Sequence, residues 1–141
     1  IEALRERVVQ GRSFTAADSE TSAPVLIVNQ TFARTYWPGQ NPIGKRALTG
    51  SPKSPWMTVV GMVQDVRHNG LTAAVREKFY IPHAQFAIST GNAPRDMSLV
   101  VRTDGDPMAL AGPIREVVKR LDPTLPVANV RSMNAVVGES M

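Results

Sequence analysis

The chain has 141 residues, of which 43% are hydrophobic and 20% are charged, so it holds enough apolar sequence for one domain or two small lobes. It has no cysteine, which excludes disulfides, thiol chemistry and cysteine zinc sites. The net charge of +4 comes from basic residues scattered among acidic ones, a pattern that argues against a nucleic-acid-binding surface.

The first part of the chain predicts a strand followed by a short helix. Residues 1–9 fit a short helix or strand, and residues 15–23 are small and polar, as in a surface loop. Residues 25–28 are all aliphatic, which indicates a strand buried on both faces of a sheet. Asn29 is a good N-cap for a helix that Pro38 stops, because proline disfavours helical geometry in the residue before it.

The middle of the chain predicts short strands and long loops. Strands are expected at 45–49, 56–66 and 79–81. The β-branched content of 56–66 favours a strand, and Gly61 within it indicates a bulge or a close approach of another backbone segment. Residues 87–95 are expected to form a loop.

The last part of the chain predicts a β-α-β unit. Residues 97–103 alternate apolar and polar side chains, as in a half-buried strand, and residues 127–131 are expected to form the second strand. Between them, Asp106 and Pro107 fit the N-cap and the first position of a helix. Ser132 is expected to cap a final helix.

The helix of this unit carries an apolar stripe at helical spacing. Its members are Leu110, Ile114, Val117, Val118 and Leu121. We expect Leu110, Ile114 and Val118 to be buried against the sheet. Pro113 conflicts with a regular helix and predicts a kink or a later helix start, while Asp122 and Pro123 end the helix.

Few residues in the sequence suggest chemistry. Of the two histidines, His83 has no carboxylate nearby, and His68 has only Asp65 at a suitable spacing, with no third metal ligand. Solvated or hydrogen-bonded roles are therefore predicted for Asp65 and His68, and no catalytic, cofactor-binding or metal residue is assigned. No phosphate-binding loop and no Gly-x-Ser-x-Gly motif is present. Partner-contact residues stay unknown, with Trp56 at a loop edge as a hint.

The most informative segment lies at residues 25–46 and reads VLIVNQTFARTYWPGQNPIGKR. It resembles a string that is typical of the extracytoplasmic domain of MacB-like, FtsX-type ABC transporter permeases. Further segments resemble motifs of the same family in the same order: TVVGMVQDVRHNGL, FYIPHAQ, MSLVVRT and LDPTLPV. Gln64 stands where that family commonly has glycine, and Pro113 is unusual for it.

The resemblance implies an α+β fold with two lobes. Residues 1–39 and 96–141 would form a porter-like lobe with a βαβ unit, a mixed sheet and helices on one face. Residues 40–95 would form an inserted, mostly-β lobe. The resemblance also implies a periplasmic position between the first two transmembrane helices of a bacterial inner-membrane permease. Since the chain begins at Ile1, we expect it to be an excised part of that longer protein.

The function implied by the resemblance is mechanical and not enzymatic, with no cofactor. The domain would transmit ATP-driven motion to a substrate or periplasmic partner, in efflux or in lipoprotein or peptide export. Its partners would be the transmembrane helices and ATPase of the same transporter, a second permease copy, and a periplasmic adaptor or cargo, with no nucleic acid. The alternative is a small α+β ligand-binding domain or enzyme with a site near Asp65 and His68.

Overall fold

The structure is a computed structural model that describes residues 6–66, 74–91 and 96–139. The chain divides into two compact units, each with its own internal contacts. The N-terminal unit consists of Ile1–Arg67 and Ala74–Ser98, and the C-terminal unit consists of His68–Ala73 and Leu99–Met141.

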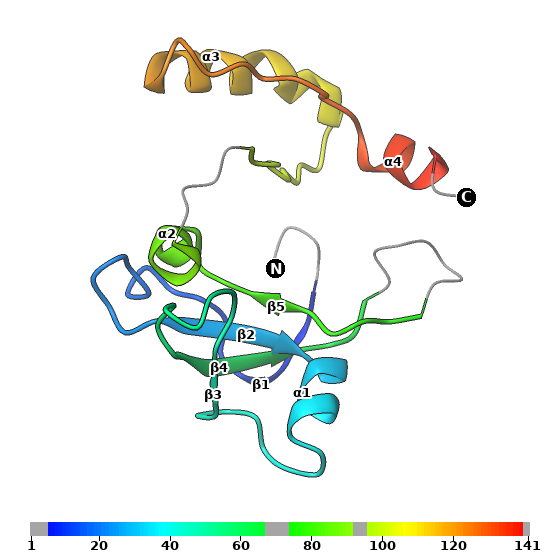
Figure 1. Ribbon diagram of the computed structural model, residues 1–141. Coiled ribbons are helices and arrows are strands. Elements are labelled where there is room, and N and C mark those ends of the chain that lie inside the picture. The colour runs from blue at the N-terminus through cyan, green and yellow to red at the C-terminus, as the bar shows by residue number, and fades with distance from the viewer. Residues whose placement is uncertain (1–5, 67–73, 92–95, 140–141) are drawn as a thin grey trace. The chain divides into compact units, whose positions relative to one another are not determined.

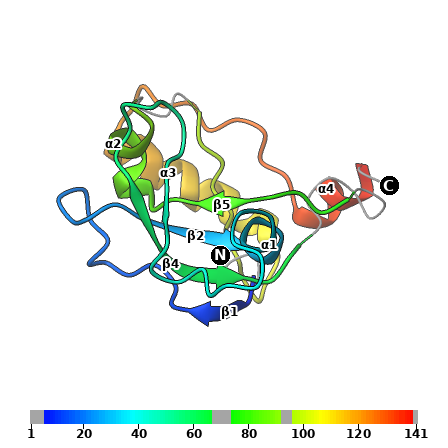
Figure 2. The same ribbon diagram turned by 60° about the horizontal axis from the view of Figure 1, so that its bottom comes forward.

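A mixed five-stranded sheet forms the centre of the N-terminal unit (Figures 1 and 2). Its strands are β1 (Val8–Gly11), β2 (Val25–Asn29), β3 (Arg46–Ala47), β4 (Met57–Val63) and β5 (Phe79–Tyr80). β4 pairs in parallel with β2 and antiparallel with both β1 and β3, while β5 pairs antiparallel with β2. The expected mixed sheet with helices is confirmed.

Helix α1 (Gln30–Tyr36) connects the two parallel strands of this sheet. The chain runs from β2 directly into α1 and returns through β3 to β4, so β2, α1 and β4 make a βαβ crossover. Strands on both sides of residue 39 thus share one sheet. The division of the chain into lobes at 1–39, 40–95 and 96–141 stays a prediction.

The core of the N-terminal unit is aliphatic and lies between the sheet and α1. Its buried members are Leu26, Val28, Ala33, Met57 and Val59. Phe32 and Trp37 of the α1 segment pack against them. Because Leu26, Ile27 and Val28 are all 0% exposed, the predicted burial of both faces of β2 is confirmed.

Gly61 permits β1 and β4 to approach each other closely. The register between β2 and β4 shifts so that Ile27 lies opposite Gly61 and Val60 is passed over, which is a bulge. A Cβ atom on Gly61 would lie 2.2 Å from the carbonyl oxygen of Arg12, so no other residue fits there without a backbone shift. Both features predicted from the glycine are confirmed.

Asn29 caps α1, as predicted, and its side chain also forms hydrogen bonds with the segment that leads into β5. Its Oδ1 accepts hydrogen bonds from the backbone N–H groups of Phe32 and Lys78, both at 2.9 Å. Its Nδ2 donates to the carbonyl of Arg76 at 2.9 Å. Asn29 is 1% exposed, so this cap is part of the interior of the unit.

The prediction of a loop at residues 87–95 is wrong for residues 87–90, which are helical. The chain forms a 3-10 helix, η1 (His83–Gln85), which continues into helix α2 (Phe86–Thr90). Gly91 then ends α2 in the left-handed conformation, with φ of 75°. The small and β-branched residues of this stretch do not predict the helix, which has a glycine cap at its C-terminal end but no side-chain cap at its N-terminal end. Residues 92–95 lie outside the described part of the chain.

The C-terminal unit contains the 3-10 helix η2 (Pro107–Leu110) and helices α3 (Ala111–Leu121) and α4 (Met133–Glu139). Asp106 Oδ1 accepts from the backbone N–H of Met108 at 2.9 Å, which confirms the predicted cap. Ser132 Oγ accepts from the N–H of Ala135 at 3.3 Å, as expected for the cap of α4. Pro113 lies in the first turn of α3, where a backbone N–H has no partner within the helix, so it does not break the helix.

The strands expected at 97–103 and 127–131 are not formed, and this corrects the predicted β-α-β unit at the C-terminal end. Neither segment has regular secondary structure or a place in a sheet within the described residues 96–139, and Asn129 in the second segment has a φ of 53°. A strand needs a hydrogen-bonded neighbour, and alternation of side chains alone does not supply one. On α3, Leu121 is 80% exposed, while Leu110, Ile114 and Val118 are half-buried. Their burial against a sheet stays a prediction.

Candidate functional site

Asp65, the carboxylate considered for a metal or enzymatic site, is engaged in holding α1. Its Oδ1 accepts from the backbone N–H of Thr31 at 2.9 Å, and its Oδ2 accepts from Thr31 Oγ1 and Arg34 Nη2, both at 2.8 Å. Partial burial opposes ionisation of Asp65, but the hydrogen bonds from Thr31 and Arg34 outweigh it and hold its pKa below the usual value. His68 lies outside the described residues. Both oxygens of Asp65 therefore already have structural partners.

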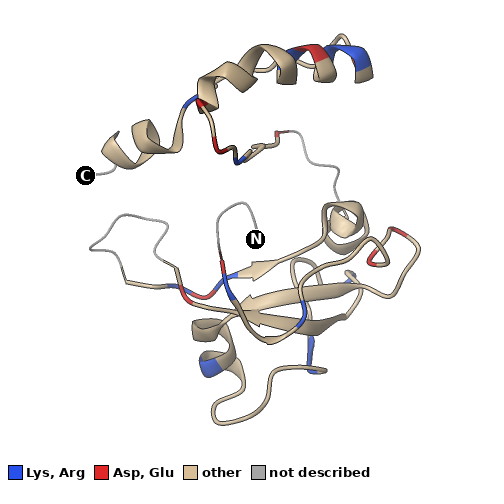
Figure 3. Ribbon diagram, turned by 180° about the vertical axis from the view of Figure 1, so that it is seen from behind, with Lys and Arg blue, Asp and Glu red and all other residues tan. Residues whose placement is uncertain are grey.

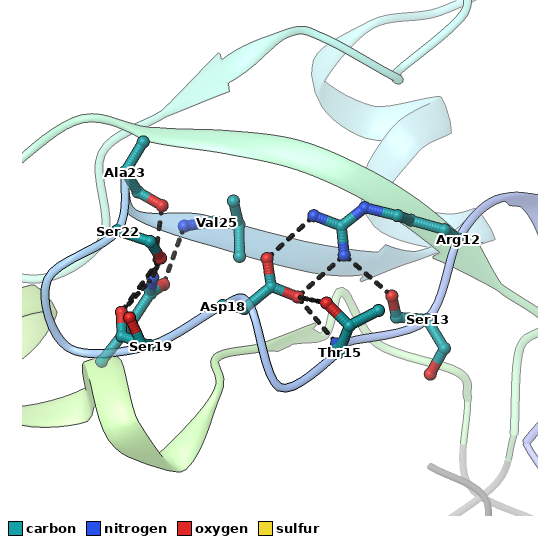
Figure 4. A network of polar contacts seen from close by, with 9 residues as sticks. Arg12, Ser13, Thr15, Asp18, Ser19, Ser22, Ala23 and Val25 are labelled. Atoms are coloured by element: carbon teal, nitrogen blue, oxygen red, sulfur yellow. Dashed lines mark hydrogen bonds and ion pairs between the residues drawn. The ribbon is translucent and has the colours of Figure 1, made fainter.

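A polar network orders the loop between β1 and β2 (Figure 4). Arg12 forms a bidentate ion pair with Asp18, with Nη1–Oδ2 and Nη2–Oδ1 distances of 2.8 Å. The backbone N–H of Thr15 also donates to Asp18 Oδ2 at 2.8 Å. Although burial alone would raise it, the pKa of Asp18 falls to about 2, chiefly because Arg12 donates to its carboxylate.

Gln85 joins the same loop to β2 and is 0% exposed. Its Oε1 accepts from the backbone N–H of Val25 at 2.9 Å. Its Nε2 donates to Ser19 O at 3.0 Å, Ser22 Oγ at 2.9 Å and Ala23 O at 3.2 Å. A buried amide with its donors and acceptor satisfied fixes the loop in one conformation.

A hollow of about 480 Å³ lies beside this network. It is lined by Phe14, Thr15, Ala16, Asp18, Ser19, Tyr80, Ile81, Pro82, His83 and Ala84. Tyr80 donates its hydroxyl to Glu6 Oε1 at 3.1 Å, and burial together with the Glu6 charge raises the pKa of Tyr80. The hydrogen bonds of Asp18 with Arg12 and of Tyr80 with Glu6 tie these two ionisable groups of the hollow to structural partners.

Metal binding has no support in the part of the chain that the structure describes. Residues 6–66, 74–91 and 96–139 contain no group of three or more His, Cys, Asp and Glu side chains that is suited to a metal ion. Within the same residues, none of the helices combines the length and the apolar character that crossing a membrane requires.

The sequence reasoning missed the role of Gln85 and the hollow beside it. The motif FYIPHAQ at 79–85 marks the position of this glutamine, but nothing in the local pattern shows that it points at Ser19 and Val25. That contact joins residues about sixty positions apart, and only the assembled sheet brings them together.

Two solved structures resemble this chain to different degrees. The periplasmic region of MacB from Actinobacillus actinomycetemcomitans has a TM-score of 0.59 and 21% sequence identity, over 82% of this chain and 50% of that chain. A domain described as part of a permease protein from Porphyromonas gingivalis has a TM-score of 0.44 and 15% identity, over 94% of this chain and 64% of that chain. The chain therefore spans about half the length of the MacB region it matches. No curated protein sequence matches the chain.

The sheet and its βαβ crossover belong to a fold that is shared with the periplasmic region of MacB. The model of the MacB-like periplasmic core domain matches residues 2–117, which is most of the chain. The chain belongs to the MacB-like periplasmic core domain family, and so it is a periplasmic domain of the ABC transporter permease class.

Proposed function

We propose that this domain is a non-catalytic mechanical part of an ABC transporter permease. In this proposal, ATP-driven movement of the membrane helices is passed to the periplasmic domain, which then acts on a substrate or a periplasmic partner in efflux or in lipoprotein or peptide export. The observation that carries the proposal is the family match over residues 2–117.

The character of the N-terminal unit supports a mechanical role. A part that transmits motion must move as one body, and a unit with a closely packed core resists deformation. The N-terminal unit has a packed core that contains Leu26, Val28 and Met57. The buried side chains of Asn29 and Gln85 add hydrogen bonds to the backbone of α1 and β2.

The partners in this proposal are the membrane helices and ATPase of the same transporter, a second copy of the permease, and an adaptor or cargo in the periplasm. The second copy offers a direct way to measure movement, because equivalent positions in the two copies are a defined pair.

The test uses the full-length permease with its ATPase in lipid, with its other cysteines removed. Single cysteines replace Ala87 on α2 or Lys119 on α3, both exposed helical positions, and each carries a spin label. We expect the distance distribution between equivalent labels in the two copies to shift when ATP is trapped, and to stay unchanged in a permease whose ATPase cannot bind nucleotide.

A distribution that is identical with and without ATP at both positions, in a preparation that still transports, would refute the transmission of motion through this domain. Transport activity in the same preparation serves as the control that the labelled permease is intact.

A further inference from the structure

Basic residues on and around β3 lack the acidic neighbours found elsewhere in the chain. Between Glu20 and Asp65 the sequence has no Asp or Glu, and its cations are Arg34, Lys45, Arg46 and Lys53. Figure 3 shows the same imbalance on the ribbon, where the segment from β2 to β4 carries blue but no red. This part of the surface therefore has a net positive field.

Arg34 differs from the other cations of this segment because it pairs with Asp65 at 2.8 Å. Lys45 Nζ donates instead to the neutral Gln40 Oε1 at 2.7 Å. Arg46 has no carboxylate partner among the described residues, and neither has Lys53. Their charge is available to an external anion.

An exposed tryptophan lies beside these cations. The guanidinium of Arg46 lies 5.5 Å from the ring centroid of Trp56, which is a cation–π contact. Arg46 pairs with Thr58 and Ala47 pairs with Met57 in the β3–β4 ladder. Met57 is 0% exposed on the core side of this ladder, whereas Trp56 is 53% exposed.

The loop that follows β3 is ordered by its own hydrogen bonds. Thr49 Oγ1 donates to Met57 Sδ at 3.3 Å at the base of the loop. At its tip, the N–H of Ser54 donates to Ser51 O at 2.9 Å, and the N–H of Lys53 donates to Ser51 Oγ at 3.2 Å. Lys53 is thus part of a hydrogen-bonded turn that precedes Trp56 and β4 in the chain.

We name this surface the basic aromatic patch and define it by Arg46, Leu48, Lys53 and Trp56, all of them exposed. We propose that the basic aromatic patch binds the anionic headgroup surface of a lipid bilayer. Tryptophan prefers the headgroup level of a membrane, aliphatic side chains such as Leu48 enter the acyl boundary, and lysine and arginine bind anionic lipids.

A lipid surface fits this patch better than an acidic protein does. An acidic protein partner would engage the cations through individual ion pairs, and it would not require the exposed aliphatic side chain of Leu48. The basic aromatic patch instead combines free cations with an exposed ring and an aliphatic side chain, which is the composition of an interfacial segment. A periplasmic domain of a permease also works next to a membrane, and this inference holds whether or not the domain transmits motion.

The direct test is binding of the 141-residue chain to lipid vesicles, measured by cosedimentation. We expect binding to vesicles that contain phosphatidylglycerol, little binding to pure phosphatidylcholine vesicles, and weakening as salt rises. Arg46→Gln and Lys53→Gln should each weaken binding roughly fivefold. The matched control is Lys119→Gln with Arg120→Gln on α3, which removes the same charge from exposed positions and should leave binding unchanged.

Tryptophan fluorescence gives a second, independent readout. Binding should shift the emission of the wild-type chain to shorter wavelength, and Trp56→Phe, which keeps an aromatic ring, should remove that shift. Because all these positions are exposed, unchanged circular dichroism is expected for each variant and verifies folding.

Equal binding to neutral and anionic vesicles, or no binding to either, would overturn the proposal. So would anionic binding that the α3 control loses and the Arg46→Gln and Lys53→Gln variants keep. Binding to a polyglutamate peptide without binding to vesicles would assign the patch to an acidic protein and would equally reject a lipid surface.

Discussion

The two units are held in shape by contacts of different range. In the N-terminal unit, residues far apart in the chain meet in the interior, as Gln85 and Val25 do. In the C-terminal unit, the helices start at caps only two or three residues away, as at Asp106 and Ser132. This difference means that the N-terminal unit is stabilised mainly by its tertiary core, whereas the ends of the helices in the C-terminal unit are set by capping residues close in sequence.

The sharpest way to break this comparison is to remove one leucine from each unit. Leu26→Ala in β2 should reduce the free energy of unfolding by about 2–5 kcal/mol, because Leu26 is 0% exposed and leaves a cavity. Leu121→Ala on α3 should change it by about 0.5 kcal/mol or less, because Leu121 is 80% exposed. Urea denaturation followed by circular dichroism measures both, and equal losses would contradict the contrast.

A second comparison uses the helix caps. Asn29→Ala should cost about 2–3 kcal/mol, because it removes the buried side chain that caps α1 and takes a hydrogen-bond partner from the N–H of Lys78 and the carbonyl of Arg76. Asp106→Ala removes an exposed cap and should cost about 1 kcal/mol.

Thermal unfolding of the two cap variants beside the wild-type chain measures the difference. Asp104→Ala, which removes a nearby acidic residue that caps no helix, is the control for the loss of charge. A cost at Asp106 as large as that at Asn29 would show that the second unit is as interdependent as the first.

A third prediction concerns the ion pair in the loop between β1 and β2. The pKa of Asp18 is lowered in the folded state from 3.8 to about 2, so its charged form stabilises the fold above about pH 4, and this contribution disappears as pH falls through 2. After allowance for screening by solvent, the contribution is on the order of 1–2 kcal/mol.

The measurement for this effect is the difference in unfolding free energy between the wild-type chain and Asp18→Asn, followed from pH 5 to pH 2. The difference should shrink as pH falls. A difference that is independent of pH would mean that the Arg12–Asp18 pair does not stabilise the loop through its charge.

Local signals in the sequence were sufficient for the elements that local physics determines. The aliphatic run of β2, the caps at Asn29, Asp106 and Ser132, and the close approach at Gly61 all follow from a few neighbouring residues. The family was also recognisable from its ordered motifs, and the match over residues 2–117 confirms it.

The predictions that were wrong concern segments whose structure depends on hydrogen-bond partners elsewhere in the chain. Residues 97–103 have the alternation of a strand but no partner among the described residues, and the parallel crossover forms instead from β2, α1 and β4. The hydrogen bonds of Gln85 could not be predicted from local sequence either, because they join it to the distant segment from Ser19 to Val25 and exist only once the sheet has assembled.

The hydrogen bonds of Gln85 also limit the positions at which a foreign sequence can be inserted into this domain. Residues 15–24 have the composition of a permissive linker, yet the amide of Gln85 holds two of their carbonyls, so an epitope tag inserted between Ser19 and Ala23 would separate groups that share one side chain. Reporter insertions therefore belong at an exposed helix end such as Gly91, where a Cβ atom would meet no atom of another segment within 4 Å.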